Sequence, residues 1–152
     1  MELGGKAANI VYEDAAIDQA VEGVVNGIFF NQGHVCCAGS RLLLQESIHD
    51  EFITKLEKRM QTLRVGNPLD KNTDIGAVNS KEQLNKIEEL VNEGVSDGGK
   101  IFQTECELPG NGFWFKPTLF TDVQPSYSIA REEIFGPVLT TLTFRTPQEA
   151  IE

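Results

Sequence analysis

The chain has 152 residues, of which 40% are hydrophobic, and this is the usual size of one domain with its own core. Its formal net charge is −10, from 23 acidic and 13 basic residues, which argues against nucleic acid or an anionic membrane surface as a partner, because such partners require clustered Lys and Arg. The sequence has no run of about 18 apolar residues and no basic segment followed by an apolar run, so we expect neither a membrane span nor a signal peptide.

Three cysteines are present, and two of them, Cys36 and Cys37, are adjacent. A bridge between neighbouring cysteines would close a strained ring, so these residues do not form a disulfide framework. We therefore expect reduced thiols in a cytoplasmic or other reducing compartment.

The first part of the chain predicts a strand and then a helix. Residues 1–11 are apolar and interrupted by Gly4 and Gly5, as in a strand whose backbone approaches another group closely. Apolar residues then recur at the helical period, which predicts a helix over residues 15–30 that ends just before the cysteines.

A strand and a second helix are expected next. Residues 41–45 suit a buried strand, and Ser47 is expected to cap the helix that follows. The inner face of that helix would consist of Phe52, Leu56, Met60 and Leu63. Its basic residues stand at helical spacing beside acidic ones and indicate a solvated face rather than an anion site: Lys55, Lys58, Arg59 and Arg64.

Residues 65–79 are rich in Gly, Pro and Asn and predict a loop. Ser80 and Gln83 form the pattern of a capping box for a third helix that ends at Gly94 or at Gly98-Gly99. The apolar face of this helix would be Leu84, Ile87, Leu90 and Val91.

The last third predicts strands over residues 100–103, 115–121 and 138–144, and then a helix that begins at Thr146-Pro147. Strands that alternate with helices indicate an α/β domain with a mostly parallel sheet and an active site at one end of the strands. The chain opens inside one predicted element and stops inside another, so we expect it to be a piece of a longer protein.

Cys36 is the first candidate for chemistry. It lies in a glycine-flanked segment, residues 33–39, between a helix end and a buried strand, where a thiol can be exposed on a constrained loop. A small buried hydrophobe is the competing interpretation, and spacing alone does not decide between the two. His34 beside Cys36 also suggests a cysteine hydrolase, and His34, Cys36, Cys37 and Cys106 suggest a zinc site, but no Cys-x-x-Cys spacing supports zinc.

Three motifs stand in order along the chain: Met-Glu-Leu-Gly-Gly-Lys at 1–6, Phe-Asn-Gln-Gly-His-Val-Cys-Cys-Ala at 30–38, and Glu-Glu-Ile-Phe-Gly-Pro-Val at 132–138. With these motifs and the connecting segments 64–69 and 115–119, the chain resembles the aldehyde dehydrogenase superfamily over essentially its whole length. The resemblance implies the three-layer catalytic domain of that fold, truncated at both ends. Residues 1–152 would then be a partial, thiol-bearing catalytic domain whose cofactor-binding domain lies mostly upstream.

The resemblance implies an NAD(P)-dependent oxidoreductase in which Cys36 is the nucleophile. In this family the thiolate adds to an aldehyde, the thiohemiacetal passes a hydride to the nicotinamide of NAD or NADP, and water hydrolyses the thioester. Glu2 matches the general base, and Gly4 and Gly5 would leave its carboxylate free to swing toward a water. Members that transfer the acyl group to coenzyme A generally lack this glutamate, so we expect hydrolysis to a carboxylic acid.

The same resemblance assigns cofactor contacts to three residues. Glu133 matches the carboxylate that holds the hydroxyls of the nicotinamide-side ribose, a role that suits a paired acceptor. Phe135 matches the aromatic near the nicotinamide, and Leu3 is assigned to the cofactor site on the same basis. A tight Phe-Gly-Pro turn that closes a strand is a structural interpretation of the third motif and is compatible with the functional one. Lys6 belongs to the first motif, but the sequence assigns it no chemical role.

The chain departs from the family pattern at two places. His34 stands where the family usually has Gln, and Ala7-Ala8 replaces Ser-Pro, so hydrogen bonding around the thiol is expected to differ. The asparagine of the oxyanion hole and most of the cofactor fold belong to upstream sequence, and no Gly-x-Gly-x-x-Gly pattern occurs. We therefore expect the isolated chain to be inactive and to self-associate through apolar surface, and the full-length protein to be a homo-oligomer.

Two functions remain open at this point. One is oxidation of a small-molecule aldehyde, with no metal ion, by the protein to which the chain belongs. The other is a non-catalytic scaffold or regulatory relative that keeps the fold without turnover. The presence of both Cys36 and Glu2 favours the enzyme.

Overall fold

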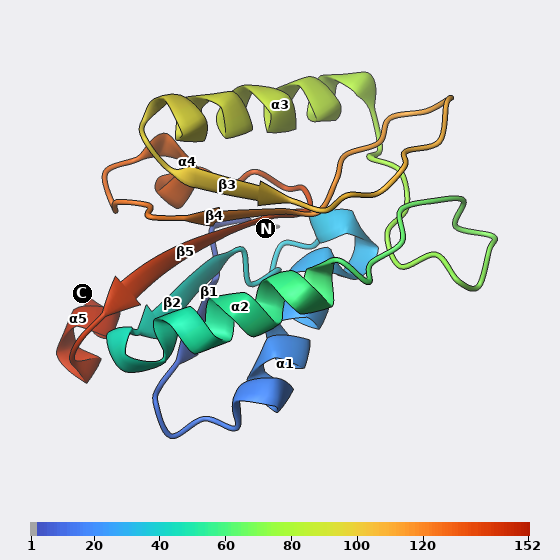
Figure 1. Cartoon of the computed structure of the whole chain (residues 1–152). Helices are drawn as coiled ribbons and strands as arrows, with labels where there is room; N and C mark the ends of the chain where they lie inside the picture. The colour runs from blue at the N-terminus through green and yellow to red at the C-terminus, as the bar shows by residue number, and fades with distance from the viewer. Residues whose placement is uncertain (1–2) are drawn as a thin grey trace.

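A five-stranded sheet forms the centre of the computed structural model, which describes residues 3–152 (Figure 1). The strands are β1 (Ala8–Val11), β2 (Arg41–Gln45), β3 (Lys100–Gln103), β4 (Thr118–Thr121) and β5 (Val138–Phe144). Their order across the sheet is β1-β2-β5-β4-β3. The first four in this order run parallel, and β3 pairs antiparallel with β4 at one edge. The predicted α/β class with a mostly parallel sheet is confirmed.

Helices cover both faces of this sheet and make three layers. The helices are α1 (Ile17–Phe29), α2 (His49–Met60), α3 (Lys81–Ser96), α4 (Ser128–Arg131) and α5 (Pro147–Ile151), with 3-10 turns η1 (Phe30–Gly33) and η2 (Glu46–Ile48). Figure 1 shows α1 and α2 on one side of the sheet and α3 on the other. Two separate groups of buried side chains match these two sides, one under α1 and α2 and the other under α3 and α4.

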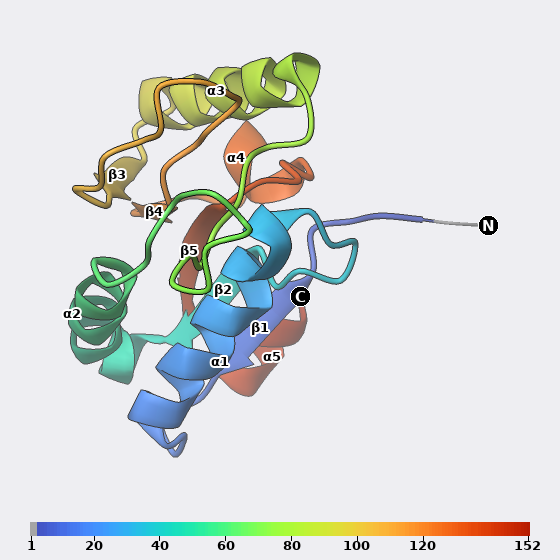
Figure 2. The same cartoon turned by 90° about the vertical axis from the view of Figure 1, so that its right-hand side faces the viewer.

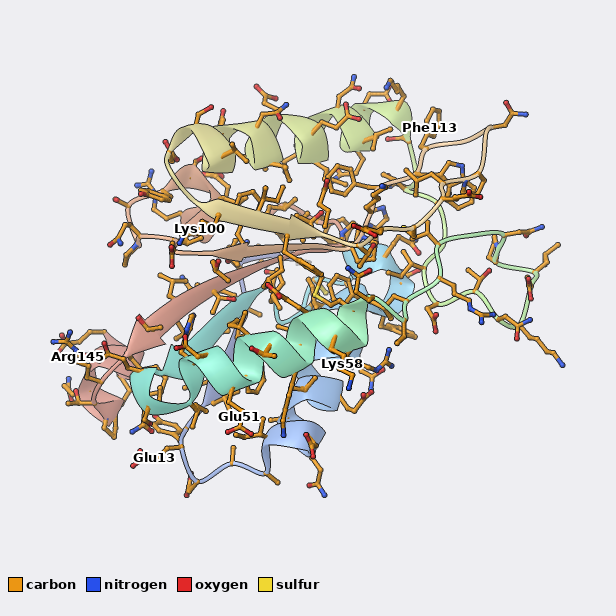
Figure 3. All side chains as sticks on the ribbon, in the orientation of Figure 1. Glu13, Glu51, Lys58, Lys100, Phe113 and Arg145 are labelled. Carbon is orange, nitrogen blue, oxygen red and sulfur yellow. The ribbon has the colours of Figure 1, made fainter. Side chains whose placement is uncertain are left out.

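The predicted apolar faces are the ones that the core uses. Phe52, Leu56 and Met60 of α2 are 0% exposed, and the four apolar residues expected on α3 are all buried. The opposite face of α2 is solvated and carries ion pairs, as expected: Lys55 pairs with Asp18 at 2.8 Å. Figure 3 shows Glu51 and Lys58 of this helix directed outward from the sheet.

Two strands are shorter than predicted. The strand expected over residues 1–11 is present from Ala8 to Val11, and the one expected over 115–121 begins at Thr118. Figure 2 shows the segment before β1 leading away from the body of the domain. The short helix α4 was not expected, because four residues carry no periodicity that a sequence pattern can display.

Helix capping follows the prediction at one helix and not at another. Ser80 caps α3, since its Oγ accepts a hydrogen bond from the Gln83 amide at 3.1 Å. The prediction for Ser47 is wrong: the turn η2 intervenes, Ile48 takes the N-cap position of α2, and the Ser47 hydroxyl donates to the Glu13 carboxylate at 2.9 Å. The serine therefore ties the loop before α1 to the start of α2.

The three cysteines are free thiols. Within residues 3–152, no helix is both long and apolar enough to cross a membrane.

Candidate active site

The candidate site lies where three parallel strands begin. The register places Ala8 of β1 beside Arg41 of β2, and Arg41 beside Thr140 of β5. Parallel neighbours start at the same edge of a sheet, so the segments that precede these strands meet there. These segments are residues 4–7, 34–40 and 133–137, and each contains part of one of the three sequence motifs. The active site was expected at one end of the strands, and the structure shows that these motifs gather at the amino end.

Cys36 and Cys37 occupy the corner of a tight turn. The amide of Ala38 donates to the carbonyl of Val35 at 2.9 Å and closes the turn, and both cysteine side chains are exposed. The backbone that follows the turn is held by β1, because the Asn9 side-chain amide donates to the Gly39 carbonyl at 3.1 Å. The interpretation of Cys36 as a small buried hydrophobe is therefore wrong. Its thiol is accessible on a constrained loop, which is the condition for a nucleophile.

Three residues with left-handed backbone conformation precede the turn. Asn31, Gln32 and Gly33 have φ values of 50°, 47° and 75°, and the Asn31 side-chain amide donates to the His34 carbonyl at 3.1 Å. A Cβ atom at Gly33 would overlap the carbonyl oxygen of Gly136. The Cys36 loop therefore packs backbone to backbone against the loop of the third motif, which only glycine at position 33 allows.

The loop of the third motif is held by α3. Phe135 adopts φ 54°, an uncommon conformation for an aromatic residue. The Gln83 side-chain amide donates to the carbonyls of Ile134 at 2.8 Å and of Phe135 at 3.0 Å. In a full capping box this side chain would return to the amide of Ser80, so the tertiary contact replaces half of the predicted local one.

Glu133 reaches from this loop to the first motif. A Cβ atom at Gly4 would overlap both carboxylate oxygens of Glu133, so the carboxylate lies directly against the Gly4 backbone. The glycine of the first motif thus makes room for the carboxylate of the third. The expectation that the glycines allow close approach of another group is confirmed at Gly4, whereas a Cβ atom at Gly5 would meet nothing within 4 Å.

Lys6 lies beside this carboxylate. Its Nζ is buried and has no hydrogen-bond partner among residues 3–152. The pKa of Lys6 is lowered to about 8, mainly by burial and also by nearby Arg41, while Glu133 acts in the opposite direction. The structure therefore places a cation next to Glu133 that is readily deprotonated, which the sequence did not show.

His34 joins the Cys36 loop to the Phe135 loop. The two rings are stacked, with centroids 5.2 Å apart and planes 9° from parallel. The backbone amide of Asn79 donates to His34 Nε2 at 3.2 Å. Burial lowers the pKa of His34 below its usual 6.5, and the Phe135 carbonyl acts in the opposite direction.

A small recess lies among these loops and is lined by Gly5, Val35, Ala38, Ser40, Glu133 and Phe135. Larger hollows open elsewhere, one of them along residues 61–67 beside Cys106, and they contain none of the predicted site residues. Glu133 and Phe135 line this recess together with residues that flank Cys36, so the structure brings the loops of the three residues together, while Cys36 itself does not line the recess. Within residues 3–152, no group of three or more His, Cys, Asp or Glu residues is placed to hold a metal ion.

Of the other two predicted residues, one is exposed and one lies outside the described part of the chain. The side chain of Leu3 is 74% exposed. Glu2 lies outside the described residues. Sequence reasoning missed the site contacts of Gln83 and Asn79, because no local signal shows that the start of a helix will also contact a loop more than forty residues away.

Comparison with known proteins shows the family of the chain. The sequence profile described as the aldehyde dehydrogenase family matches residues 1–152. The chain belongs to the aldehyde dehydrogenase family. It is 46% identical to retinal dehydrogenase 2 of Taeniopygia guttata over 155 residues, covering 100% of this chain and 29% of that protein. It is also 46% identical to an aldehyde dehydrogenase of Emericella nidulans, with 100% and 31% of the two chains covered.

Solved structures of this family share the fold. An NAD-dependent aldehyde dehydrogenase from Sinorhizobium meliloti matches with a TM-score of 0.94 and 42% identity, over 99% of this chain and 30% of that one. A betaine aldehyde dehydrogenase from Staphylococcus aureus, in complex with NAD+, matches with a TM-score of 0.94 and 41% identity, over 99% and 30% of the two chains. The chain thus spans about a third or less of the relatives that it matches, and within that span it has the aldehyde dehydrogenase fold.

Proposed function

We propose that this chain is the thiol-bearing part of the catalytic domain of an aldehyde dehydrogenase that converts an aldehyde to a carboxylic acid. The observation that carries the proposal is the exposed turn of Cys36 at the sheet edge where the Glu133 and Phe135 loops also end. The names of the relatives support the reaction class. The chain spans about a third or less of the length of these relatives.

Cys36 acts as the nucleophile. Its thiolate forms a carbon–sulfur bond with the carbonyl carbon of the aldehyde, and the carbonyl electron pair moves to oxygen. Loss of the aldehydic hydrogen with its electron pair leaves a thioester on Cys36. A water then attacks this thioester and releases the acid, and Glu2 takes the proton of that water as general base. The assignment of Glu2 depends on the family motif alone, because this residue lies outside the described part of the chain.

The residues at the sheet edge fit a nicotinamide dinucleotide. The Glu133 carboxylate is a paired acceptor suited to two adjacent ribose hydroxyls, and Gly4 leaves space for it that any larger residue would fill. Phe135 would pack near the nicotinamide end, and Leu3 belongs to the same site. NAD or NADP, when bound, supplies the oxidant. The relatives solved with NAD+ favour NAD for this chain as well.

Three further expectations follow for the whole protein. Its thiols require a reducing compartment, since all three cysteines are free. We expect a homo-oligomer, because apolar side chains such as Phe30 and Leu69, 72% and 92% exposed, are available for further packing. We also expect the isolated chain to lack turnover, because the family motifs place the oxyanion asparagine and the larger part of the cofactor site outside it.

The nucleophile is tested by competition between two thiols on one turn. Cys36 and Cys37 are both exposed, so an alkylating reagent can reach either thiol. Their alkylation rates below pH 8, measured by peptide mass spectrometry, therefore compare the reactivity of two accessible thiols. We expect Cys36 to react about tenfold faster or more, because a catalytic cysteine is more reactive than a thiol without that role. Cys37→Ser serves as the control variant and should leave the Cys36 rate unchanged. Equal rates for the two thiols would count against Cys36 as a nucleophile activated within this domain.

A further inference from the structure

His34 belongs to a set of contacts that connects the two loops of the site. Its ring stacks on Phe135, and its Nε2 accepts from the amide of Asn79. Asn79 directly precedes the cap of α3, and Gln83 in the first turn of that helix holds the Phe135 carbonyl. His34 thus contacts the Phe135 loop directly and also contacts the segment that holds this loop in place.

The hydrogen bond from Asn79 requires one protonation state of the His34 imidazole. An Nε2 that accepts from an amide must carry a lone pair, so the neutral ring has its proton on Nδ1. Protonation would place a hydrogen on Nε2 facing the Asn79 N–H, and two donors cannot bond. Nδ1 is buried without a hydrogen-bond partner among residues 3–152. A hydrogen bond of Nδ1 therefore does not replace the one that Nε2 loses on protonation.

No charged neighbour stabilises the imidazolium. Along the packed elements, the ionisable groups nearest in sequence are Glu133 on the Phe135 loop, Lys81 after Asn79, and Cys36 on the loop of His34 itself. Burial lowers the pKa of His34 by more than the Phe135 carbonyl raises it, and none of these charged groups contributes to the shift. The packing therefore favours the neutral ring.

We propose that neutral His34 is a positioning residue that sets the relative placement of the Cys36 turn and the Phe135 loop, and that protonation of its ring releases this coupling. The significance for catalysis rests on the proposed roles of Cys36 and Phe135, whereas the coupling itself can be measured without substrate or cofactor. Glutamine, the residue usual in the family at this position, could keep the acceptor but could not stack a ring.

The coupling is tested on the full chain by NMR of the histidine side-chain nitrogens across pH 5–8. His49, the other histidine of the sequence, is the internal control, and a His49→Gln variant assigns the two signals. We expect His34 to show the Nδ1–H tautomer and a pKa below 6.5, and we expect the Phe135 ring signals and the Cys36 amide signal to move with the same midpoint. An Nε2–H tautomer, or Phe135 and Cys36 signals that ignore the His34 titration, would overturn the proposal.

Two variants of His34 test its ring stacking and its hydrogen-bond acceptor separately. His34→Phe keeps a ring to stack and loses the acceptor, whereas His34→Gln keeps an acceptor and loses the ring, and neither titrates. In the wild type the ratio of Cys36 to Cys37 labelling should change between pH 7 and pH 5 by about twofold or more, the effect of a small coupling energy between contacting residues. In both variants the ratio of Cys36 to Cys37 labelling should not change in this way between pH 7 and pH 5. A wild-type change that persists unaltered in both variants would show that His34 is not its source.

The result for His34 is distinguishable from the result for the proposed function. If Cys36 never outpaces Cys37 but the Phe135 ring still follows the His34 titration, the nucleophile assignment fails and the coupling stands. If Cys36 outpaces Cys37 while the Phe135 signals ignore His34, the coupling fails and the nucleophile assignment stands.

Discussion

Burial of the Lys6 ammonium shows how strongly the fold changes the chemistry of a single residue. Its pKa falls from 10.5 to about 8, with burial as the first cause and Arg41 as the second. The folded chain therefore binds this proton less tightly than the unfolded chain. The native state is penalised by the charge below pH 8, and the penalty is relieved as pH rises from 8 to 10.5. A shift of this size corresponds to about 3 kcal/mol.

Lys6→Met removes the charge and keeps most of the volume of the side chain. We expect the variant to raise the free energy of unfolding at pH 7 by about 1–3 kcal/mol, and we expect this gain to shrink as pH approaches 10.5. Urea unfolding at several pH values measures both effects, and Lys86→Met on the exposed face of α3 is the control. A loss of stability at pH 7 would mean that the ammonium has a compensating partner.

At the level of elements, α3 both covers the sheet and supports the site. Its apolar face was predicted from periodicity and is buried as expected. Its first turn, however, supplies Gln83, whose side chain leaves the local capping pattern to bind two carbonyls of the Phe135 loop. That loop carries a residue at φ 54°, so hydrogen bonds are needed to keep it in this conformation.

Gln83→Met keeps the length of the side chain and removes both donors. Two partly buried carbonyls then lose their partner, and we expect a loss of about 1–3 kcal/mol in the free energy of unfolding. Asn85→Ala, at an exposed position of α3, is the matched control and should change stability little. Thermal and urea unfolding followed by circular dichroism give the comparison. If the two variants behave alike, the Gln83 bonds contribute nothing to stability.

At the level of the whole molecule, the site exists because segments about a hundred residues apart begin parallel strands at one edge of the sheet. Gly33 and Gly136 are in contact there, and Gly33 has φ 75°. The Cys36 turn and the Phe135 loop can approach each other only if position 33 has no side chain. The stability of the whole domain and the geometry of the site therefore depend on the same contact.

Gly33→Ala would introduce a Cβ atom against the Gly136 carbonyl in a left-handed backbone. We expect it to lower the free energy of unfolding by about 3 kcal/mol or more, through overlap together with backbone strain. Gly23→Ala in α1 is the control, because a Cβ atom there meets nothing within 4 Å and the backbone is helical. That control should stabilise the chain by about 0.5–1 kcal/mol. Similar values for both variants in urea unfolding would contradict the packing described for Gly33.

Much of the fold could be predicted because it depends on local patterns. The strand Arg41–Gln45 and the helices α1 and α3 agree with prediction to within a few residues, because the period of apolar residues records which face is buried. Ser47 was predicted wrongly for the opposite reason, since its hydroxyl has a distant partner in Glu13 that competes with capping. Of the candidate site, the motif residues were identified through family resemblance rather than through local physics.

The sequence by itself determined the α/β class and the buried faces, since both are recorded in the spacing of neighbouring residues, and its motifs named the candidate site residues through family resemblance. Only the tertiary structure decided that the motifs meet at the amino ends of the strands, because strand order and register are set by pairing between distant segments. It also decided the state of Lys6 and the partners of His34 and Gln83. Burial and long-range contacts determine these properties, and neither is encoded in the spacing of residues along the chain.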